Sequence, residues 1–478
     1  MDFSIKKAKI VATLGPASRS KKQIRLLLGK GADVFRINFS HGTHDDHRET
    51  LENIAQAGIG LKKHPGILAD LQGPKIRTGK TESDSSVVLI NGRSVLIRPG
   101  KGLCNADTIY VDYPALIDDV KAGQHILIND GAIELTVKKV DIKENALHCK
   151  ILNTGTYSSR KGVNLPDSEL SIPSMTPKDR RDLKFILEKE VHYIALSFVR
   201  MAEDLTEVNN AVKRSKKPIK VLAKIEKPEA AERVDDILNV CDGIMVARGD
   251  LGVETSPQEV PILQKHLITR ANEMGKLVIV ATQMLESMIN SPRPTRAEAA
   301  DVANAVLDRT DALMLSGETA VGSYPAKTVT MMERIISTTE KSTYYPRDIT
   351  DLSLKYRYPP YALCEAAAWA GKDLDNVPVL VFTVSGNTAL YLSKIRTQSH
   401  IFGFSPDPAV VSLLALAWNV TPFLIDFDKN IVSLQKKAEQ ILLKSKCVKK
   451  NDLVLVLSGT TPARGATNFL RVKKVGEL

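Results

Sequence analysis

Eight apolar segments separated by longer spacers constrain the fold of this chain more than any other feature of its sequence. The segments occupy residues 9–15, 33–40, 66–72, 193–199, 220–226, 243–249, 277–283 and 312–318. Each is apolar along nearly its whole length, as expected for parallel strands that are covered on both faces. Helix-like stretches, such as residues 45–63 and 295–309, lie between successive segments. Eight strands that alternate with helices predict a closed (β/α)8 barrel, the TIM barrel, rather than an open sheet.

A change of pattern divides the chain into domains. Short segments of alternating polarity in the third spacer, with Gly, Asn and Asp at the turns, predict a small inserted β domain. The barrel then resumes with a helix at whose start Thr176 and Asp179 resemble a capping box. An alanine-rich helix and four further strands predict an open α/β domain at the end of the chain. The predicted domains are the first barrel part (1–72), the inserted β lid (73–166), the second barrel part (167–342) and a C-terminal α/β effector domain (343–478).

The composition is that of an ordinary globular protein, with 43% hydrophobic and 25% charged residues. No apolar run reaches the roughly 18 residues of a membrane span, and the start of the chain lacks the apolar core of a signal peptide. The five cysteines are scattered and form no C-x-x-C motif, which indicates a reducing compartment rather than a disulfide or zinc framework. We therefore expect a cytoplasmic protein without a membrane partner.

The formal net charge of +11 is high. Binding to nucleic acid is one interpretation, but the basic residues form no long block and aromatic residues make up only 5% of the chain. An anionic small substrate or a solvated basic surface explains the charge better. We expect no nucleic-acid partner.

Polar residues gather at the carboxyl ends of the predicted barrel strands, which is where the active sites of such barrels lie. In chain order they are Arg36, Asn38, Ser40, His41, Asp70, Ser197, Arg200, Lys224, Glu226, Arg248, Gly249, Asp250, Thr282, Gln283, Ser316 and Glu318, with Arg77 shortly after the third strand. An ion pair that closes the barrel rim would explain any one of them. It does not explain the whole set, because polar groups buried at strand ends cost stability unless they are paired.

Lys224, Glu226 and Asp250 suggest a metal-assisted reaction. Lys224 and Glu226 are two residues apart on one strand, so their side chains point to the same face. Glu226 and Asp250 come from neighbouring strands and can share a divalent cation, and oxygen ligands without His or Cys favour Mg²⁺ or Mn²⁺. A plain Lys–Glu ion pair at the rim is the alternative. With the arginines, the set favours phosphoryl transfer on an anionic compound, without the loop of the P-loop kinases.

Six blocks of the sequence closely resemble motifs of the pyruvate kinases, and the resemblance extends over essentially the whole chain. The blocks are KIVATLGPAS, RINFSHGTHDDH, DLQGPKIRTG, AKIEKPEA, IMVARGDLGVE and ATQMLESMINSPRPTRAEAADVANAVLDRTDALMLSGETAVGSYP. The resemblance implies transfer of the phosphoryl group of phosphoenolpyruvate to ADP, which gives pyruvate and ATP. It also implies Mg²⁺, or else Mn²⁺, as the cofactor and a homotetramer as the assembly.

The resemblance also assigns catalytic roles. It implies that Glu226 and Asp250 hold Mg²⁺ and that Lys224 neutralises the phosphoryl group during transfer, as suits a compact ammonium. Arg36 resembles the phosphate-holding arginine of the family, and Arg77 is placed near the same anion and the nucleotide.

Further positions follow from the resemblance. The amides of Gly249 and Asp250 and the hydroxyl of Thr282 resemble the cradle for the pyruvate carboxylate, and Ser197 is counted among the substrate-binding residues. Thr282 would also lie near the enol carbon, where a proton must arrive, but a hydroxyl is a poor acid and a water chain is the better proton source. The nucleotide-binding positions are Asn38, His41, Arg77, Asp130 and Lys161. The last two match residues of a lid that closes over the nucleotide and excludes water.

The stretch DLQGPKIRTG (70–79) departs from the family pattern. Many members need K⁺, bound by oxygens at the positions of Asn38, Ser40 and Asp70, and carry DTKGPEIRTG instead. This chain has Lys75 in place of the glutamate and Leu71 in place of the threonine. The ammonium of Lys75 can place a positive charge where K⁺ would bind, so the sequence predicts catalysis without K⁺. The alternative is that Lys75 only pairs with Asp70 at the rim.

The stretch TVSGNTA (383–389) follows a predicted strand and opens a helix, and amide groups at a helix start bind anions readily. The candidate effector residues are Thr383, Ser385, Gly386, Asn387 and Thr388, with SGTTPARGATN (458–468) as the neighbouring loop. The stretch resembles the effector-phosphate loop of the family, which implies allosteric activation by a phosphorylated metabolite such as a sugar phosphate or a nucleoside monophosphate. A simple helix cap is the alternative.

Two other functions are open on the sequence alone. A magnesium-dependent lyase or aldolase on a pyruvate-type substrate would use similar Glu and Asp ligands, although the inserted lid and the pair Arg36 and Arg77 favour a nucleotide clamp. A non-catalytic binding protein with the same fold is disfavoured by the intact set of Lys224, Glu226 and Asp250. A fold by itself does not decide between these functions.

Overall fold

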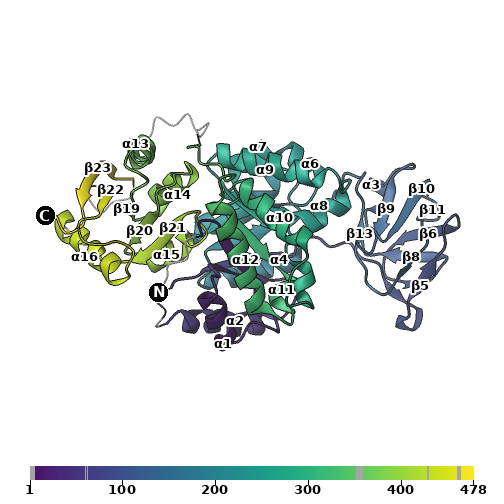
Figure 1. The fold of residues 1–478 in the computed structure, drawn as a ribbon. Coiled ribbons are helices and arrows are strands. Elements are labelled where there is room, and N and C mark those ends of the chain that lie inside the picture. Colours follow the sequence, from purple (N-terminus) through teal and green to yellow (C-terminus); the bar gives the residue numbers. More distant parts are fainter. Residues whose placement is uncertain are drawn as a thin grey trace.

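A closed parallel barrel lies in the middle of the molecule (Figure 1). The computed structural model describes residues 6–59, 61, 63–350, 359–427, 430–459 and 465–477. The barrel strands are β1 (Lys9–Thr13), β2 (Val34–Asn38), β3 (Gly66–Asp70), β14 (Tyr193–Leu196), β15 (Lys220–Ile225), β16 (Gly243–Ala247), β17 (Leu277–Ala281) and β18 (Ala312–Leu315). Their order around the ring is β1-β18-β17-β16-β15-β14-β3-β2. The predicted (β/α)8 barrel is therefore confirmed.

Helices surround the barrel, and side-chain caps define the starts of several of them. Their bounds are α1 (Lys21–Gly29), α2 (His44–Gly58), α4 (Pro177–Glu188), α5 (Thr206–Ser215), α6 (Pro228–Glu232), α7 (Val234–Val240), α8 (Arg248–Glu254), α9 (Val260–Glu273), α10 (Arg296–Leu307), α11 (Gly317–Ala320) and α12 (Pro325–Lys341). The predicted capping box of Thr176 and Asp179 is confirmed at the start of α4. Within the described parts of the chain, no helix has the length and apolar character needed to cross a membrane.

A small β domain lies beside the barrel, between β3 and α4 in the chain (Figure 1). It consists of β4 (Lys80–Thr81), β5 (Val87–Leu89), β6 (Ser94–Pro99), β7 (Leu103–Cys104), β8 (Thr108–Val111), α3 (Leu116–Asp119), β9 (His125–Ile128), β10 (Ile133–Asp141), β11 (Ala146–Ile151), β12 (Gly155–Tyr157) and β13 (Val163–Asn164). Its main sheet has the order β13-β9-β10-β11-β6-β8 and covers an apolar core of its own. We call it the lid domain.

The two segments that connect the lid domain to the barrel pair with each other. The amide of Thr78 donates to the carbonyl of Lys161 at 2.8 Å, and the amide of Val163 donates to the carbonyl of Ile76 at 3.0 Å. At the start of the incoming segment, Gly73 has a φ of +67°, and a Cβ there would lie 3.0 Å from the Cβ of Ser197. The lid domain is therefore attached through a two-stranded ribbon rather than through two independent linkers.

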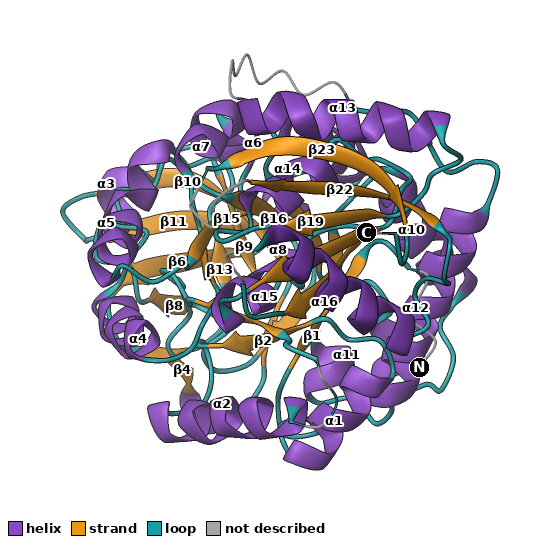
Figure 2. Ribbon diagram, turned by 90° about the vertical axis from the view of Figure 1, so that its left-hand side faces the viewer, coloured by secondary structure: helices purple, strands orange, loops and turns teal. Residues whose placement is uncertain are grey.

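The C-terminal domain is an α/β sandwich (Figure 2). Its sheet has the order β21-β20-β19-β22-β23. The elements are α13 (Pro359–Asp373), β19 (Val379–Phe382), α14 (Asn387–Lys394), β20 (Ile401–Ser405), α15 (Pro408–Leu414), β21 (Val420–Leu424), α16 (Ile431–Lys444), β22 (Leu453–Gly459) and β23 (Thr467–Lys474). Residues of α13, α14 and α15 pack on one face and residues of α16 on the other. The sequence predicts four of these strands, and the antiparallel edge strand β23 is an addition.

The barrel and the C-terminal domain meet at the amino ends of the barrel strands. Asp311 immediately precedes β18, has no exposed surface, and accepts a hydrogen bond from the ammonium of Lys394 at 2.8 Å. The guanidinium of Arg396 lies 2.9 Å from the same carboxylate and 4.9 Å from the ring centroid of Trp418. Apolar residues of both domains complete the contact. Two buried basic side chains therefore share one buried carboxylate across this interface, where burial, opposed by Asp311, lowers the pKa of Lys394 to about 7.

Candidate active site

The carboxyl ends of the barrel strands bring the predicted catalytic residues together. Arg36 and Asp70 come from the neighbouring strands β2 and β3, and Asn38 pairs with Asp70 in the register of these strands. Lys224 comes from β15, and Ser197 directly follows β14, which lies between β15 and β3. Because adjacent parallel strands end at the same edge, their last side chains converge on one side of the barrel.

Lys224 is the centre of a buried charge network. Its ammonium lies 2.8 Å from Oε1 of Glu226 and 3.4 Å from Oδ1 of Asp70, and it donates to the hydroxyl of Ser197 at 2.7 Å. Burial disfavours the charged form, but the carboxylates of Asp70 and Glu226 outweigh it, so that the pKa of Lys224 lies above its ordinary value. The lysine therefore remains a fixed positive charge at the barrel mouth.

Asp70 also pairs with the guanidinium of Arg36. Nε of Arg36 donates to Oδ2 of Asp70 at 2.7 Å. Burial would raise the pKa of Asp70, but Lys224 and Arg36 keep it below its usual value. This carboxylate, which is 1% exposed, thus fixes two cations on one side of the site.

Glu226 and Asp250 form a carboxylate pair that fits a divalent cation. Oε2 of Glu226 accepts the amide of Phe198 at 2.8 Å, and Phe198 has a φ of +56° that turns this amide toward the site. Burial, opposed by Lys224 and reinforced by the nearby charge of Asp250, raises the pKa of Glu226 to about 6. A cation between the two carboxylates would relieve their repulsion, and hard oxygens are the ligands that Mg²⁺ and Mn²⁺ prefer.

The start of α8 is fastened to the end of β17. The amide of Gly249 donates to Oγ1 of Thr282 at 2.7 Å, and Oγ1 of Thr282 donates to the carbonyl of Ala281 at 2.6 Å. Thr282 has a φ of +71°, which is costly for a β-branched residue and marks a strained position at the site. The guanidinium of Arg248 donates to the carbonyl of Thr282 at 2.9 Å and to Asp301 at 2.6 Å.

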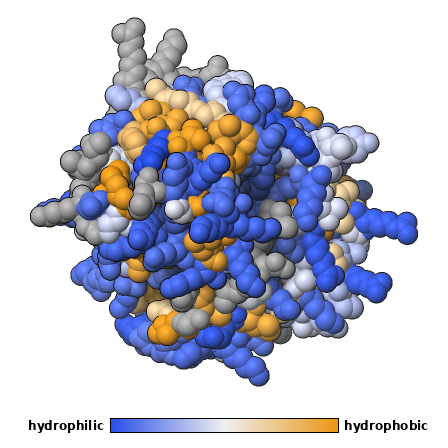
Figure 3. Space-filling view, turned by 60° about the vertical axis from the view of Figure 1, so that its left-hand side comes forward, coloured by the Kyte–Doolittle hydropathy of each residue, from blue (hydrophilic) through white to orange (hydrophobic). Residues whose placement is uncertain are grey.

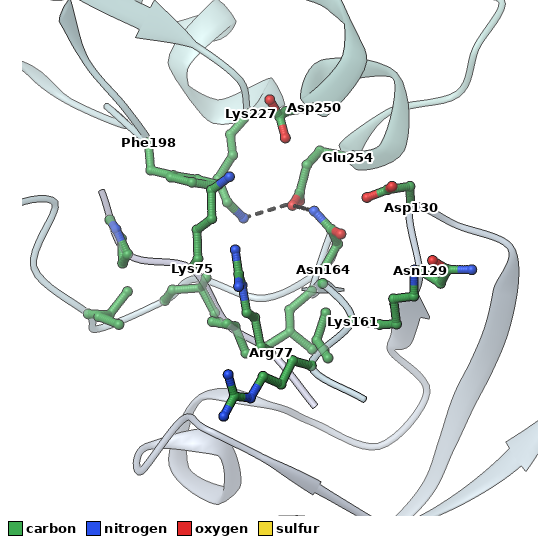
Figure 4. A pocket seen from close by; sticks show the side chains of 18 of the residues that line it. Lys75, Arg77, Asn129, Asp130, Lys161, Asn164, Phe198, Lys227, Asp250 and Glu254 are labelled. Carbon is green, nitrogen blue, oxygen red and sulfur yellow. Dashed lines mark hydrogen bonds and ion pairs between the residues drawn. The ribbon is translucent and has the colours of Figure 1, made fainter. Parts of the chain in front are cut away.

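A pocket of about 260 Å³ lies between the barrel and the lid domain (Figure 4). Arg77 and Lys161 line it from the paired connecting segments, Asp130 from the lid domain and Asp250 from α8. The structure thus brings Arg77, Asp130 and Lys161 of the predicted nucleotide site into one cavity with Asp250, a predicted metal carboxylate. The other two predicted nucleotide residues, Asn38 at the end of β2 and His41 in the loop that follows, do not line this pocket.

Lys75 lines the same pocket, and Asp70 is paired with other basic residues. The side chain of Lys75 is exposed, and within the described residues no ion pair joins it to Asp70, whose carboxylate is held by Arg36 and Lys224. Burial, and then the charges of Lys75 and Arg77, lower the pKa of His41, so Lys75 acts on the loop that carries Asn38 and Ser40. In that loop the amide of Ser40 donates to Oδ1 of Asn38 at 3.1 Å.

The candidate effector loop opens α14 as predicted. Gly386 is the N-cap residue with a φ of +84°, and within the described residues no side chain caps the helix there. The amide of Gly386 instead donates to the hydroxyl of Thr383 at 3.0 Å, and Asn387 is exposed. Thr388 is buried, with its hydroxyl 2.8 Å from that of Thr467. The loop thus offers amides and the side chains of Ser385 and Asn387, whereas Thr388 faces inward. Residues 460–464 of the neighbouring loop lie outside the described residues.

Three further charged residues shape the site: Glu318 belongs to the polar residues that the sequence places at the strand ends, whereas Lys227 and Glu254 are not evident from it. Glu318, which follows β18, is fully buried and accepts the amides of Ser316 and Leu285, so it shapes two loops at the barrel mouth. Glu254 and Lys227 form a buried ion pair next to Asp250. Their only sequence signal is a position close to the predicted metal carboxylates.

Comparisons with known proteins agree with this geometry. The family model described as "Pyruvate kinase, barrel domain" matches residues 5–329, and that described as "Pyruvate kinase, alpha/beta domain" matches residues 361–473. The chain is 42% identical to pyruvate kinase 2 of Synechocystis sp. over 98% of this chain and 79% of the relative. It is 38% identical to a pyruvate kinase of Staphylococcus epidermidis over 99% of this chain and 81% of the relative. The crystal structure of a pyruvate kinase from Cryptosporidium parvum superposes with a TM-score of 0.92 at 32% identity, covering 99% of this chain and 98% of that one. The chain therefore belongs to the pyruvate kinase family and is a phosphotransferase.

Proposed function

We propose that the protein transfers the phosphoryl group of phosphoenolpyruvate to ADP. The bond between phosphorus and the enol oxygen breaks, a bond to the terminal oxygen of ADP forms, and the enolate takes up a proton to give pyruvate. The observation that carries the proposal is the ammonium of Lys224, which is held 2.8 Å from Glu226 at the barrel mouth beside Arg36. Fixed charges of this kind stabilise the charge that develops on a phosphoryl group in transfer.

Each of the other residues has a proposed part in the same reaction. Arg36 and Arg77 bind the phosphate groups. The amides of Gly249 and Asp250 bind the carboxylate of the substrate, which the amide of Gly249 would share with Oγ1 of Thr282, its acceptor in this structure. Glu226 and Asp250 would hold Mg²⁺, which supplies charge neutralisation when bound. The lid positions Asp130 and Lys161 close over the nucleotide and exclude water.

The proton that reaches the enol carbon is proposed to come from water. Thr282 accepts the amide of Gly249 and donates to the carbonyl of Ala281, so its own proton is engaged. A water chain near Thr282 is therefore a better source than its hydroxyl.

A direct assay tests the reaction. The protein is mixed with phosphoenolpyruvate, ADP and Mg²⁺, and ATP is measured. Formation of ATP that requires all three supports the proposal, and its absence contradicts it. A magnesium-dependent lyase or aldolase would instead cleave a C–C bond without needing ADP.

We also propose that a phosphorylated metabolite binds the loop at the start of α14 and activates the enzyme. The support is the start of α14, where no side chain of the described residues forms a cap and where helix amides favour an anion. We expect a sugar phosphate or a nucleoside monophosphate to lower the phosphoenolpyruvate concentration for half-maximal rate by at least about fivefold, a common size for allosteric coupling. Steady-state kinetics with each compound measure this shift.

The structure selects Asn387→Glu as the variant for this loop, because Asn387 is exposed whereas Thr388 is buried. The added carboxylate should repel the phosphate and abolish the shift. Gln440→Glu, an exposed change on α16 of the same domain, is the matched control and should keep the shift. If no phosphorylated compound has an effect, or if the shift survives Asn387→Glu, the effector site is misplaced.

A homotetramer is the proposed assembly. The support is the outer side of the C-terminal domain, where the edge strand β23 and the adjoining helix α13 expose Val472 and Trp369 to 49% and 53%. Figure 3 shows a face of the molecule on which apolar atoms gather among hydrophilic side chains. An edge strand with apolar neighbours can pair with a second copy. We expect light scattering to give the mass of four chains, and Trp369→Glu to reduce it; a monomer would contradict the proposal.

A further inference from the structure

Three side chains next to the carboxylate pair join the lid domain to the barrel (Figure 4). Nδ2 of Asn164 donates to Oε1 of Glu254 at 2.6 Å, and Nζ of Lys227 donates to Oε2 of Glu254 at 3.2 Å. The side chains of Lys227 and Glu254 are 3% and 2% exposed. We call Asn164, Lys227 and Glu254 the latch.

The latch is linked to both chain segments that carry the carboxylate pair. Lys227 directly follows Glu226 in the chain, and Glu254 ends the helix whose first turn carries Asp250. Asn164 belongs to β13, the last strand of the lid domain. The same hydrogen-bond cluster therefore reaches both carboxylate-bearing segments and the lid.

Helix α8 is consequently held at both ends. Its amino end is fastened to the barrel by the hydrogen bond from Gly249 to Thr282 at 2.7 Å. Its carboxyl end is fastened by Glu254 to Lys227 and to the lid. A seven-residue helix has little freedom to shift when both ends are bound, so the lid contact contributes to the position of Asp250.

Loss of the hydrogen bond from Asn164 would leave a buried oxygen of Glu254 without a donor. A nearly fully buried carboxylate needs a donor for each oxygen, because an unsatisfied buried acceptor costs the desolvation of that group. If Asn164 withdraws with the lid, Oε1 loses the donor that it has in this structure. The carboxylate then has to turn toward water or toward Lys227, and either movement displaces the end of α8.

We propose that Glu254 is a positioning residue that couples the position of the lid to the spacing of Glu226 and Asp250. With the latch closed, the carboxylate pair binds a divalent cation more tightly. The inference rests on the proposed metal site. By linkage, the bound cation favours the latched lid by the same factor.

Binding of Mn²⁺ to the full chain, measured by electron paramagnetic resonance without substrates, tests the proposal. Asn164→Leu keeps the size of the side chain but removes the donor, and we expect it to raise the Kd for Mn²⁺ at least about fivefold. Asn164→Asp, which places a second carboxylate against Glu254, should raise it further. Combining Asn164→Asp with Glu254→Gln reverses the donor and the acceptor, and should restore the Kd to within about twofold. Asn153→Leu serves as the matched control, because it removes two hydrogen bonds inside the lid domain, one donated to the carbonyl of Ala132 and one accepted from the amide of Glu134.

A second measurement follows the lid itself. Spin labels at Ile142→Cys in the lid domain and Ile262→Cys on α9, two positions that are 81% and 67% exposed, report the distance between the lid and the barrel. Four native cysteines are buried, and Cys447→Ser removes the partly exposed fifth. With Mg²⁺ we expect one narrow distance distribution in the parent protein and a broader one after Asn164→Leu.

The outcomes separate the latch from the metal site. An Asn164→Leu protein that binds Mn²⁺ as the parent does, and shows only a lower melting temperature, would reduce the latch to a structural contact and overturn the inference. A parent protein that binds no Mn²⁺, or a Glu226→Gln protein that binds it unchanged, would overturn the proposed metal site and the latch with it. Weaker binding in both Glu226→Gln and Asn164→Leu, with rescue by the exchanged pair, supports both.

Discussion

Replacing Lys224 with methionine is expected to lower kcat by about 10²–10³ while the protein folds normally. Methionine keeps most of the length of the side chain but removes the ammonium that lies between Glu226, Asp70 and Ser197. The charge on the phosphoryl group in transfer would then lose one of its fixed counter-charges. Because the interaction acts mainly in the transition state, kcat and kcat/KM should fall together.

The control for Lys224→Met is a second lysine substitution on the same strand. Lys220 begins β15, at the end opposite the site, and lies 2.8 Å from Asp242. Lys220→Met removes a lysine from the same element without touching the site, and it should keep kcat within about twofold. Steady-state kinetics at saturating substrates, with thermal melting as a check on folding, measure both proteins. Turnover near that of the parent in Lys224→Met would reject the proposed role.

Full turnover without added K⁺ is the second expected result with a large consequence. The structure favours this proposal over a rim ion pair, because Lys75 is exposed in the pocket while Arg36 and Lys224 occupy Asp70. The ammonium of Lys75 is close enough to the loop after β2 to lower the pKa of His41, and it would repel a monovalent cation bound beside that loop. Rates in buffer free of K⁺ and NH₄⁺ are compared with rates in KCl and in a bulky-cation salt of equal ionic strength. A K⁺-specific increase above about tenfold, equivalent to ~1.4 kcal/mol in the barrier, would contradict the proposal.

Replacing Lys75 and Leu71 with the residues of the K⁺-dependent pattern should make catalysis depend on K⁺. Lys75→Glu, combined with Leu71→Thr, restores the residues found in the K⁺-dependent pattern, and we expect a more than tenfold loss of rate in K⁺-free buffer that KCl reverses. Lys80→Glu makes the same change of charge at an exposed position of β4 and serves as the control. A double variant that is still indifferent to K⁺ counts against the proposal as strongly as a K⁺-activated parent does.

The barrel and the centre of its site could be predicted from the sequence because each follows from a short pattern. Parallel strands that are covered on both faces leave an unbroken apolar run, and the polar residues at the ends of those runs converge by symmetry. Glu226 and Asp70 accordingly both lie within ion-pair distance of Lys224 in the structure. Their catalytic roles, like the K⁺ and effector sites, are still proposals.

Other features depend on contacts that no local pattern encodes. Asn164 and Glu254 are 90 residues apart in the chain and belong to different domains, so their hydrogen bond exists only once both have folded. The positive φ of Phe198 and Thr282 opposes the intrinsic preference of these residue types and is imposed by their surroundings. The edge strand β23 was missed because most of its residues are partly or fully exposed, so it lacks the apolar run that identified the other strands.

The buried charges at the floor of the barrel determine which joint of the molecule can bend. Any rotation between the barrel and the C-terminal domain would separate Lys394 or Arg396 from Asp311, and a buried charge without its partner costs roughly 3–5 kcal/mol. The lid domain, by contrast, is joined by a ribbon and the side chain of Asn164. The C-terminal domain is therefore fixed to the barrel more firmly than the lid domain is. We therefore expect the lid domain to rotate more readily than the C-terminal domain, and any movement of α14, whose last residue is Lys394, to act on Asp311 next to the start of β18.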